Sequence, residues 1–263
     1  MSSGVSSAGR AQVSGKTLRQ DNWWLSPLVT FVVFAGFVVF ATVRAFMGTD
    51  YYAAPYLSPF FSPCLAANCV EGSSDLGQPI GDWWKLSPAL IILIFPLGFR
   101  LTCYYYRKAY YRAFWLSPPA CGVAEPHGRY TGETGFPLIF QNIHRYFWMA
   151  AVLVGLVLSY DAVLAFRDED GEWGHMGLGT VLMVGNVVLI WLYTLGCHSC
   201  RHIVGGRLRH FSKHPVRYKA WGLVSKLNAR HGLYAWLSLF SVAFVDFYVY
   251  LLATDRITDL RFF

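Results

Sequence analysis

Charge is scarce in this sequence: only 14% of the 263 residues are Asp, Glu, Lys or Arg, whereas 55% are hydrophobic and 17% are aromatic. So few charges exclude a chain solvated mainly by water and indicate one surrounded by lipid. We expect no cleavable signal peptide, because the N-terminus is rich in Ser and Gly and no small-residue cleavage site follows the first apolar run. We expect residues 1–19 to form a disordered cytoplasmic tail.

Five apolar stretches are long enough to cross a hydrocarbon layer of about 30 Å as helices of roughly 20 residues. They cover about residues 27–47, 88–106, 137–165, 176–199 and 231–253. The sequence therefore predicts an all-α integral membrane protein, with five transmembrane helices in an up-down bundle over residues 20–253. Residues 254–263 are then a short tail on the outer side.

The distribution of Lys and Arg predicts the orientation of the bundle, since short cytoplasmic loops of membrane proteins retain these residues. The segment from Arg201 to Arg230 contains eight cationic residues, whereas the opposite loops are acidic around Asp75 and Glu169. We therefore expect the N-terminus in the cytoplasm and the C-terminus outside, in a bacterial cell (inner) membrane. The net charge of +7 lies at these membrane ends and gives no reason to expect nucleic-acid binding.

The six cysteines divide between the two sides of this predicted topology. Cys64 and Cys69 fall in an outer loop, where oxidation is permitted, and are predicted to form a disulfide. Cys103, Cys121, Cys197 and Cys200 fall on the reducing side. Unpaired cysteines there are either packed as small hydrophobic residues or act as metal ligands.

Four potential ligands from four spans lie at one predicted depth. Counted from the outer end of each span at about 1.5 Å per residue, Cys103, His144, Cys197 and His231 are each 20 or 21 residues deep. Ionisable side chains in the membrane normally face the bundle interior and have a partner. A lone Cys or His is more often structural, but several at one depth favour a metal centre.

Three kinds of metal centre compete for these residues. A dihaem arrangement lacks histidines in the outer half of the spans, although one haem b held by His144 and His231, or by His198, stays open. A structural zinc suits two cysteines and two histidines but has no evident purpose inside a membrane. A Rieske-type [2Fe-2S] cluster fits both the residue types and an electron-transfer role.

Within the Rieske hypothesis, the two imidazoles are His144 and His231. The thiolates are two of Cys103, Cys197 and Cys200. Cys197 and Cys200 are three residues apart on one predicted helix and would share a face, while Cys103 could instead pair with one of them across the bundle. His198 is a second-choice ligand. If both cysteines of its span face the bundle interior, the His198 side chain points away from them.

A quinone site needs hydrogen-bond donors, aromatic walls and access from lipid. Candidates near the cytoplasmic level are Trp23, Trp24, Ser26, Arg100, Tyr105, Trp148, Arg201 and Tyr234. Any one of them could equally belong to an interfacial aromatic belt with snorkelling arginines. Deeper in the membrane, Asp246 could carry protons or simply form hydrogen bonds within the bundle.

Four runs resemble the single-chain membrane anchor of a bacterial succinate dehydrogenase (respiratory complex II), the cytochrome b-like, SdhC-type subunit, and specifically its haem-free class. The runs are Thr102–Arg112 (TCYYYRKAYYR), Pro118–Cys121 (PPAC), Asn142–Tyr146 (NIHRY) and Gly196–His202 (GCHSCRH), and the resemblance covers about residues 20–253. It implies two partners on the basic cytoplasmic face: a flavoprotein that oxidises succinate to fumarate in the tricarboxylic acid cycle, and an iron–sulfur protein that passes electrons towards quinone.

The resemblance also implies the cofactors: a Rieske-type cluster, with menaquinone as the expected quinone, in a complex that could form a higher oligomer. The sequence departs from the five-span dihaem anchors at Cys103, which stands near the level of an expected haem ligand. The leading interpretation is thus an electron-transfer subunit of succinate:quinone oxidoreductase. Alternatives are a haem b-containing anchor or a purely structural one; a transporter fits less well, because the spans lack paired Gly/Pro interruptions.

Overall fold

The protein is described by a computed structural model that covers residues 22, 24–73, 83–110 and 139–263. The predicted tail at 1–19, Trp23 and Cys121 lie outside the described residues. The rest is mainly helical, which agrees with the predicted all-α class. The helices are α1 (Leu25–Met47), α2 (Ala89–Ile92), α3 (Ile94–Thr102), α4 (Tyr104–Arg107), α5 (Phe140–Leu164), α6 (Leu178–Leu195), α7 (His198–Gly205), the 3₁₀ turn η3 (Phe211–Lys213), α8 (Pro215–Ala229) and α9 (His231–Ala253).

Four of the described helices are long and apolar enough to cross a membrane: α1, α5 from Asn142, α6 and α9. The broken helix formed by Ala89–Thr102 and Tyr104–Tyr110 makes a fifth if its pieces count as one span. The second predicted span is therefore not one continuous helix. Pro96 has no backbone N–H to donate, and the helix is interrupted nearby at Leu93. The second break, at Cys103, has no proline beside it.

The chain divides into two compact units, each taken here by itself. The smaller unit comprises residues 1–35 and 101–143. Within its described part, Phe34 of α1 stacks on Tyr106 of α4 with ring centroids 4.6 Å apart. The Tyr110 hydroxyl donates to the Leu101 carbonyl, which ties the turns on either side of Cys103 together.

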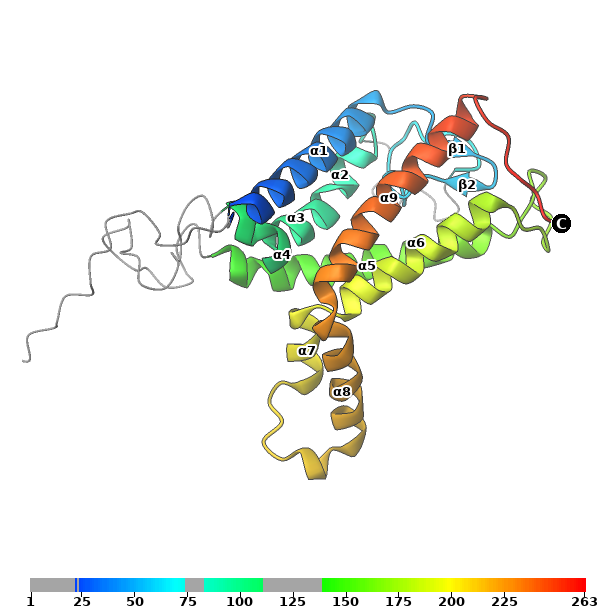
Figure 1. Ribbon diagram of the computed structural model, residues 1–263. Coiled ribbons are helices and arrows are strands. Elements are labelled where there is room, and N and C mark those ends of the chain that lie inside the picture. The colour runs from blue at the N-terminus through cyan, green and yellow to red at the C-terminus, as the bar shows by residue number, and fades with distance from the viewer. Residues whose placement is uncertain (1–21, 23, 74–82, 111–138) are drawn as a thin grey trace, which may run out of the picture. The chain divides into compact units, whose positions relative to one another are not determined.

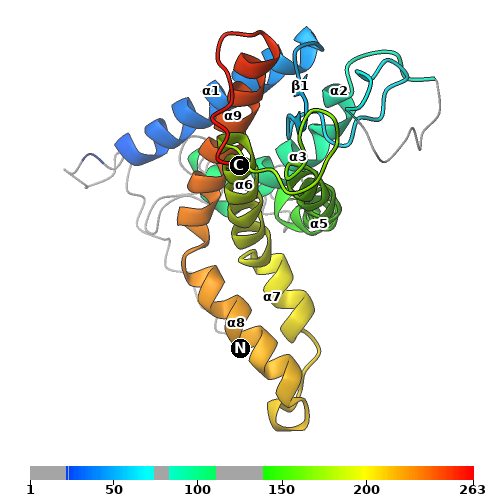
Figure 2. The same cartoon turned by 90° about the vertical axis from the view of Figure 1, so that its right-hand side faces the viewer.

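The larger unit comprises residues 36–100 and 144–263, and its two ends differ. At one end, hereafter the loop-covered end, residues 48–73, 165–177 and 254–263 cover the helix termini (Figure 1). At the other end, hereafter the hairpin end, α7 and α8 form a helical hairpin beyond α6 and α9 (Figure 2). The α6 and α9 helices lie side by side between these ends.

The hairpin corrects the sequence-based expectation of a loop between the last two spans. The sequence predicts a fourth span to residue 199, but α6 ends at Leu195 and α7 begins at His198. Arg217 of α8 donates to the carbonyls of Ile203, Val204 and Gly206, which are left unsatisfied where α7 ends. These bonds hold the two helices together as a hairpin.

A short segment after α1 inserts into the loop-covered end. It begins with the antiparallel strands β1 (Tyr52–Ala53) and β2 (Tyr56–Leu57). Ser58, Phe60, Phe61 and Ser62 follow, none more than 1% exposed. Cys64 and Cys69 close the segment with a disulfide, and their Cα atoms are 6.1 Å apart. The segment thus forms part of the core rather than a solvated loop.

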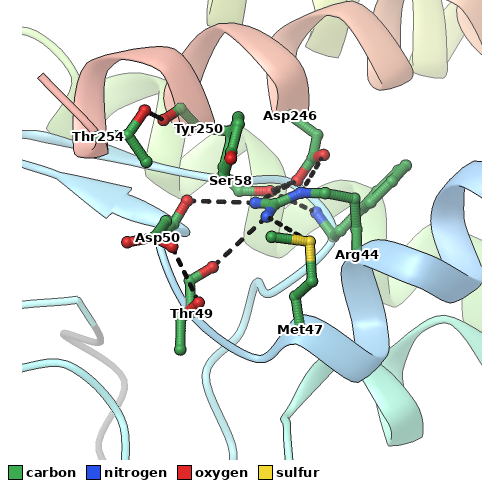
Figure 3. Close-up of polar contacts among 9 residues, drawn as sticks. Arg44, Met47, Thr49, Asp50, Ser58, Asp246, Tyr250 and Thr254 are labelled. Carbon is green, nitrogen blue, oxygen red and sulfur yellow. Dashed lines mark hydrogen bonds and ion pairs between the residues drawn. The ribbon is translucent and has the colours of Figure 1, made fainter. Parts of the chain in front are cut away.

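A buried ion pair joins α1 to α9 beside this segment (Figure 3). Arg44 Nε donates to Asp246 Oδ2 over 2.9 Å, and the two residues are 3% and 0% exposed. Ser58 Oγ donates to the other carboxylate oxygen over 2.5 Å, and the Arg44 guanidinium also donates to the Asp50 carbonyl over 3.2 Å. Of the two roles open for Asp246, the structure shows hydrogen bonding within the bundle.

The C-terminal tail packs onto the start of α6. Asp259 accepts hydrogen bonds from the Tyr56 and Tyr248 hydroxyls, each over 2.6 Å, and from the Gly179 N–H over 2.9 Å. A side chain at Gly177 would clash with this carboxylate, so the close approach requires glycine. Burial, followed by the hydrogen bond to Asp259, raises the pKa of Tyr56 to about 12. Residues 254–263 are therefore a docked tail.

Candidate redox site at the hairpin end

The break between α6 and α7 places Cys197 at the hairpin end. Cys197 has an extended backbone (φ −66°, ψ 144°) and is the N-cap of α7, where its sulfur accepts from the Ser199 N–H over 3.4 Å. Gly196 permits the break, because an added Cβ would lie 2.7 Å from the Leu192 carbonyl oxygen. Asn228 of α8 donates to the Gly196 carbonyl over 2.8 Å and holds the turn.

His144 and Cys197 are in direct contact. His144 Nε2 lies 3.2 Å from Cys197 Sγ, and the sulfur is fully buried. The His144 ring stacks on Phe99 of α3, with centroids 4.9 Å apart and planes 11° from parallel. The pair therefore has a fixed ring orientation and no access to bulk water at the sulfur.

His231 is the first residue of α9 and lies next to the same turn. A Cβ built on Gly196 would be 3.4 Å from His231 Nδ1, so the imidazole faces the residue preceding Cys197. The ring is 4% exposed and stacks on Tyr193, with centroids 4.9 Å apart and planes 8° from parallel. His144 and Cys197 thus touch, and His231 adjoins them.

Two aromatic residues connect the histidines. Phe99 and Tyr193 have ring centroids 4.9 Å apart, so the order is His144, Phe99, Tyr193, His231. We call Phe99 and Tyr193 the aromatic bridge. It was not predicted from the sequence, because residues this common in membrane helices carry no signal of a shared contact.

Arg100 is buried against the aromatic bridge rather than snorkelling to the surface. Its guanidinium carbon lies 4.9 Å from the Tyr193 ring centroid, and it donates over 3.1 Å to both the Ala235 carbonyl and Ser238 Oγ of α9. The positive charge of Arg100 therefore stabilises negative charge close to the aromatic bridge.

The remaining candidate ligands occupy different surroundings. Cys103 belongs to the smaller unit, where it is buried and, like Cys197, is an extended N-cap residue (φ −68°, ψ 135°). Cys200 is buried within α7. The prediction that Cys197 and Cys200 lie within one unbroken helix is wrong, because Cys197 is the N-cap that precedes α7. His198 is exposed and pairs with the His202 ring instead.

The predicted quinone residues do not form one cluster in the larger unit. Trp148 donates to the Thr194 carbonyl over 2.8 Å, whereas Arg201 turns to α8, where it bonds Ser225 and lies over Trp221. Tyr234 is half-buried on α9. In the smaller unit, Trp24 and Ser26 are exposed and Tyr105 is half-buried.

The chain shares its sequence and fold with known succinate dehydrogenase anchors. Residues 25–255 match the family described as actinobacterial succinate dehydrogenase subunit SdhC. The chain belongs to this family. It is also similar to a chain in a solved structure titled "Mycobacterium smegmatis Sdh1 complex in the apo form", with 57% identity over 98% of each chain and a TM-score of 0.86. Among curated proteins, no sequence matches significantly.

The donor set of this SdhC family member consists of a contacting imidazole and thiol, with a second imidazole next to the same turn. Within the described ranges, no three His, Cys, Asp or Glu side chains are close enough to hold one metal ion together. A tetrahedral zinc site needs such a group around a single ion. A Rieske-type cluster takes only two protein ligands at each iron. The contacting imidazole and thiol, with His231 beside them, supply both donor types that it requires.

Proposed function

We propose that this SdhC subunit is the electron-transfer anchor of a succinate:quinone oxidoreductase. It would bind an iron–sulfur partner, itself joined to a flavoprotein, and pass electrons through a Rieske-type [2Fe-2S] centre to quinone, with menaquinone the expected acceptor. The observation that carries the proposal is the His144–Cys197 contact, with His231 adjacent, inside a helix bundle of this family.

His144 and His231 are the proposed imidazole ligands, and the proposed thiolates are two of Cys103, Cys197 and Cys200, of which Cys197 contacts His144. Cys103 and Cys197 each have an extended backbone and precede a helix. Such a cluster, when bound, accepts and releases one electron at a time. Phe99 and Tyr193 fix the planes of the two imidazoles and exclude water, while Arg100 raises the local positive potential.

The His144→Ala, His231→Ala double variant tests this function. We expect quinone reduction by the assembled complex to fall at least about a hundredfold, because loss of a ligand should cost no less than loss of a residue that merely orients one. Succinate oxidation with a soluble acceptor that draws electrons from the hydrophilic partners should be unchanged. The matched control is His198→Ala, His202→Ala, which removes two exposed imidazoles from the same end. Normal quinone reduction in the first double variant would refute the proposal.

We also propose that the hairpin end faces the cytoplasm and docks the partners. No acidic residue occurs between Glu172 and Asp246, so the eight cations of the hairpin segment have no acidic neighbour along the chain. This pattern matches cytoplasmic retention and an acidic docking surface on a partner. Lys213→Cys and Asp170→Cys, at opposite ends, should differ in reaction with an impermeant thiol reagent in intact cells: only Asp170→Cys is labelled. Labelling of Lys213→Cys alone would reverse the orientation.

A further inference from the structure

Two histidines of α7 lie side by side at the surface of the hairpin end. His198 is the first residue of α7, and His202 follows about one helical turn later. Both side chains are exposed, and their ring centroids are 4.4 Å apart with the planes at 60°. Ser199 and Cys200, which lie between them in the sequence, are buried. Residues four apart on an α-helix share a face, so the two imidazoles project together into solvent.

The spacing and separation of these rings fit a single metal ion held by two imidazoles. The run from His198 to His202 reads HSCRH, and two histidines at this spacing on one helix face bind zinc in a class of metalloproteases. With Zn–N distances of about 2.0–2.1 Å and a tetrahedral angle, two bound imidazoles have centroids roughly 5 Å apart. Exposed side chains reach that separation from 4.4 Å by a small rotation. Ser199 stands where those proteases have their glutamate base, so the expected chemistry is binding without hydrolysis.

The ring nitrogens of this pair face solvent rather than other side chains. Within the described part of the chain, no hydrogen bond engages either imidazole. The nearest cation in the run, Arg201, turns to α8, where its Nε donates to Ser225 Oγ over 3.1 Å and its guanidinium lies over the Trp221 ring. The nitrogens are therefore open to water or to an ion.

The ligand type selects the class of ion. Imidazole nitrogen is a good ligand for Cu²⁺, Ni²⁺ and Zn²⁺, whereas Mg²⁺ and Ca²⁺ need oxygen ligands. The sequence contains no acidic residue between Glu172 and Asp246, so the hairpin segment offers no carboxylate to a hard ion. Among the described residues, no third His, Cys, Asp or Glu completes the pair to a closed site. Water would fill the remaining positions around an ion bound here.

We propose that His198 and His202 form a surface site for a divalent late transition-metal ion. Of the three ions, Cu²⁺ binds most tightly, as it does at nitrogen sites in general. The site is separate from the proposed redox centre, because its imidazoles project into solvent whereas the sulfur of Cys197 is buried against His144. The inference therefore stands independently of the proposed function.

Titration of the whole, untagged, oxidised complex with Cu²⁺ tests the proposal. Electron paramagnetic resonance of the bound Cu²⁺ should show hyperfine structure from two imidazole nitrogens. His202→Ala should weaken binding at least about tenfold and remove one of the two nitrogens, because loss of a ligand should cost no less than loss of a residue that merely orients one. The matched control is His210→Ala with His214→Ala. These two histidines have the same spacing but flank the 3₁₀ turn η3 with non-helical backbone, so Cu²⁺ binding should be unchanged.

An unchanged Cu²⁺ affinity in His202→Ala, or a bound signal without imidazole nitrogen, would overturn the assignment. A larger loss of affinity in the His210, His214 double variant than in His202→Ala would also overturn it, because the site would then lie at the hairpin loop. Competition adds a test that needs no variant: Zn²⁺ and Ni²⁺ should displace Cu²⁺ only in excess, and Mg²⁺ should not displace it. If the His202→Ala complex does not assemble, His202→Gln replaces it in the same titration.

Discussion

The two ends of the larger unit use polar residues in opposite ways. At the loop-covered end, acids are matched by donors: Asp246 binds Arg44 and Ser58, Asp161 accepts from Ser62, and Asp259 joins the inserted segment to the tail. At the hairpin end, an imidazole touches a thiol, helices break at glycine and cysteine, and the segment carries cations without acids. The comparison indicates that matched polar pairs stabilise the loop-covered end, while the hairpin end holds the residues of the proposed redox site.

The largest stability effect is expected at Asp246. Asp246→Ala leaves Arg44 buried without its carboxylate, which costs about 3–5 kcal/mol because an unpaired buried charge is poorly solvated. The unfolding midpoint of the detergent-solubilised complex should fall clearly, and the spectrum of the redox centre in protein that remains folded should be unchanged.

A matched double variant separates charge from packing in that experiment. Arg44→Met with Asp246→Leu removes both charges, so most of the lost stability should return. An Asp246→Ala protein as stable as wild type would show that the ion pair does not hold α1 to α9.

A smaller effect is expected at Tyr56. Tyr56→Phe removes a hydrogen bond to a carboxylate and should cost about 1.5–3 kcal/mol. The hydroxyl also has a raised pKa of about 12 when folded, against an ordinary value of 10.0, so its contribution is complete below pH 10 and is lost as the pH rises towards 12. Wild type should thus lose more stability than Tyr56→Phe between pH 10 and 12; parallel curves would contradict this assignment.

The sequence predicted features that depend on composition and spacing along one segment. The apolar runs located the helices, and counting along each run placed His144, Cys197 and His231 at the same end of the bundle. It could not predict the break at Cys197, because a glycine and a cysteine inside an apolar run are also compatible with an unbroken helix. The sequence also contained one signal that we missed. Arg44 is a cation within the first predicted span, and a charge inside a membrane normally has a partner. In the structure that partner is Asp246.

Tertiary contacts between common residues were beyond the sequence. The aromatic bridge pairs Phe99 with Tyr193 across 94 positions, and nothing local distinguishes them from other aromatic residues of the spans. The α7–α8 hairpin was read as a loop because its cations hide the apolar periodicity, while Arg217 stabilises it through backbone carbonyls.

The most direct test of the central claim is electron paramagnetic resonance of the reduced complex, with iron and labile sulfide counted in parallel. Wild type should show a Rieske-type signal in addition to those of the iron–sulfur partner. Cys197→Ala should lose that signal and two irons per complex, whereas His202→Ala, at an exposed residue of α7, should keep both. A Rieske-type signal that survives Cys197→Ala, or a wild-type complex with haem absorbance and no additional cluster iron, would contradict the account.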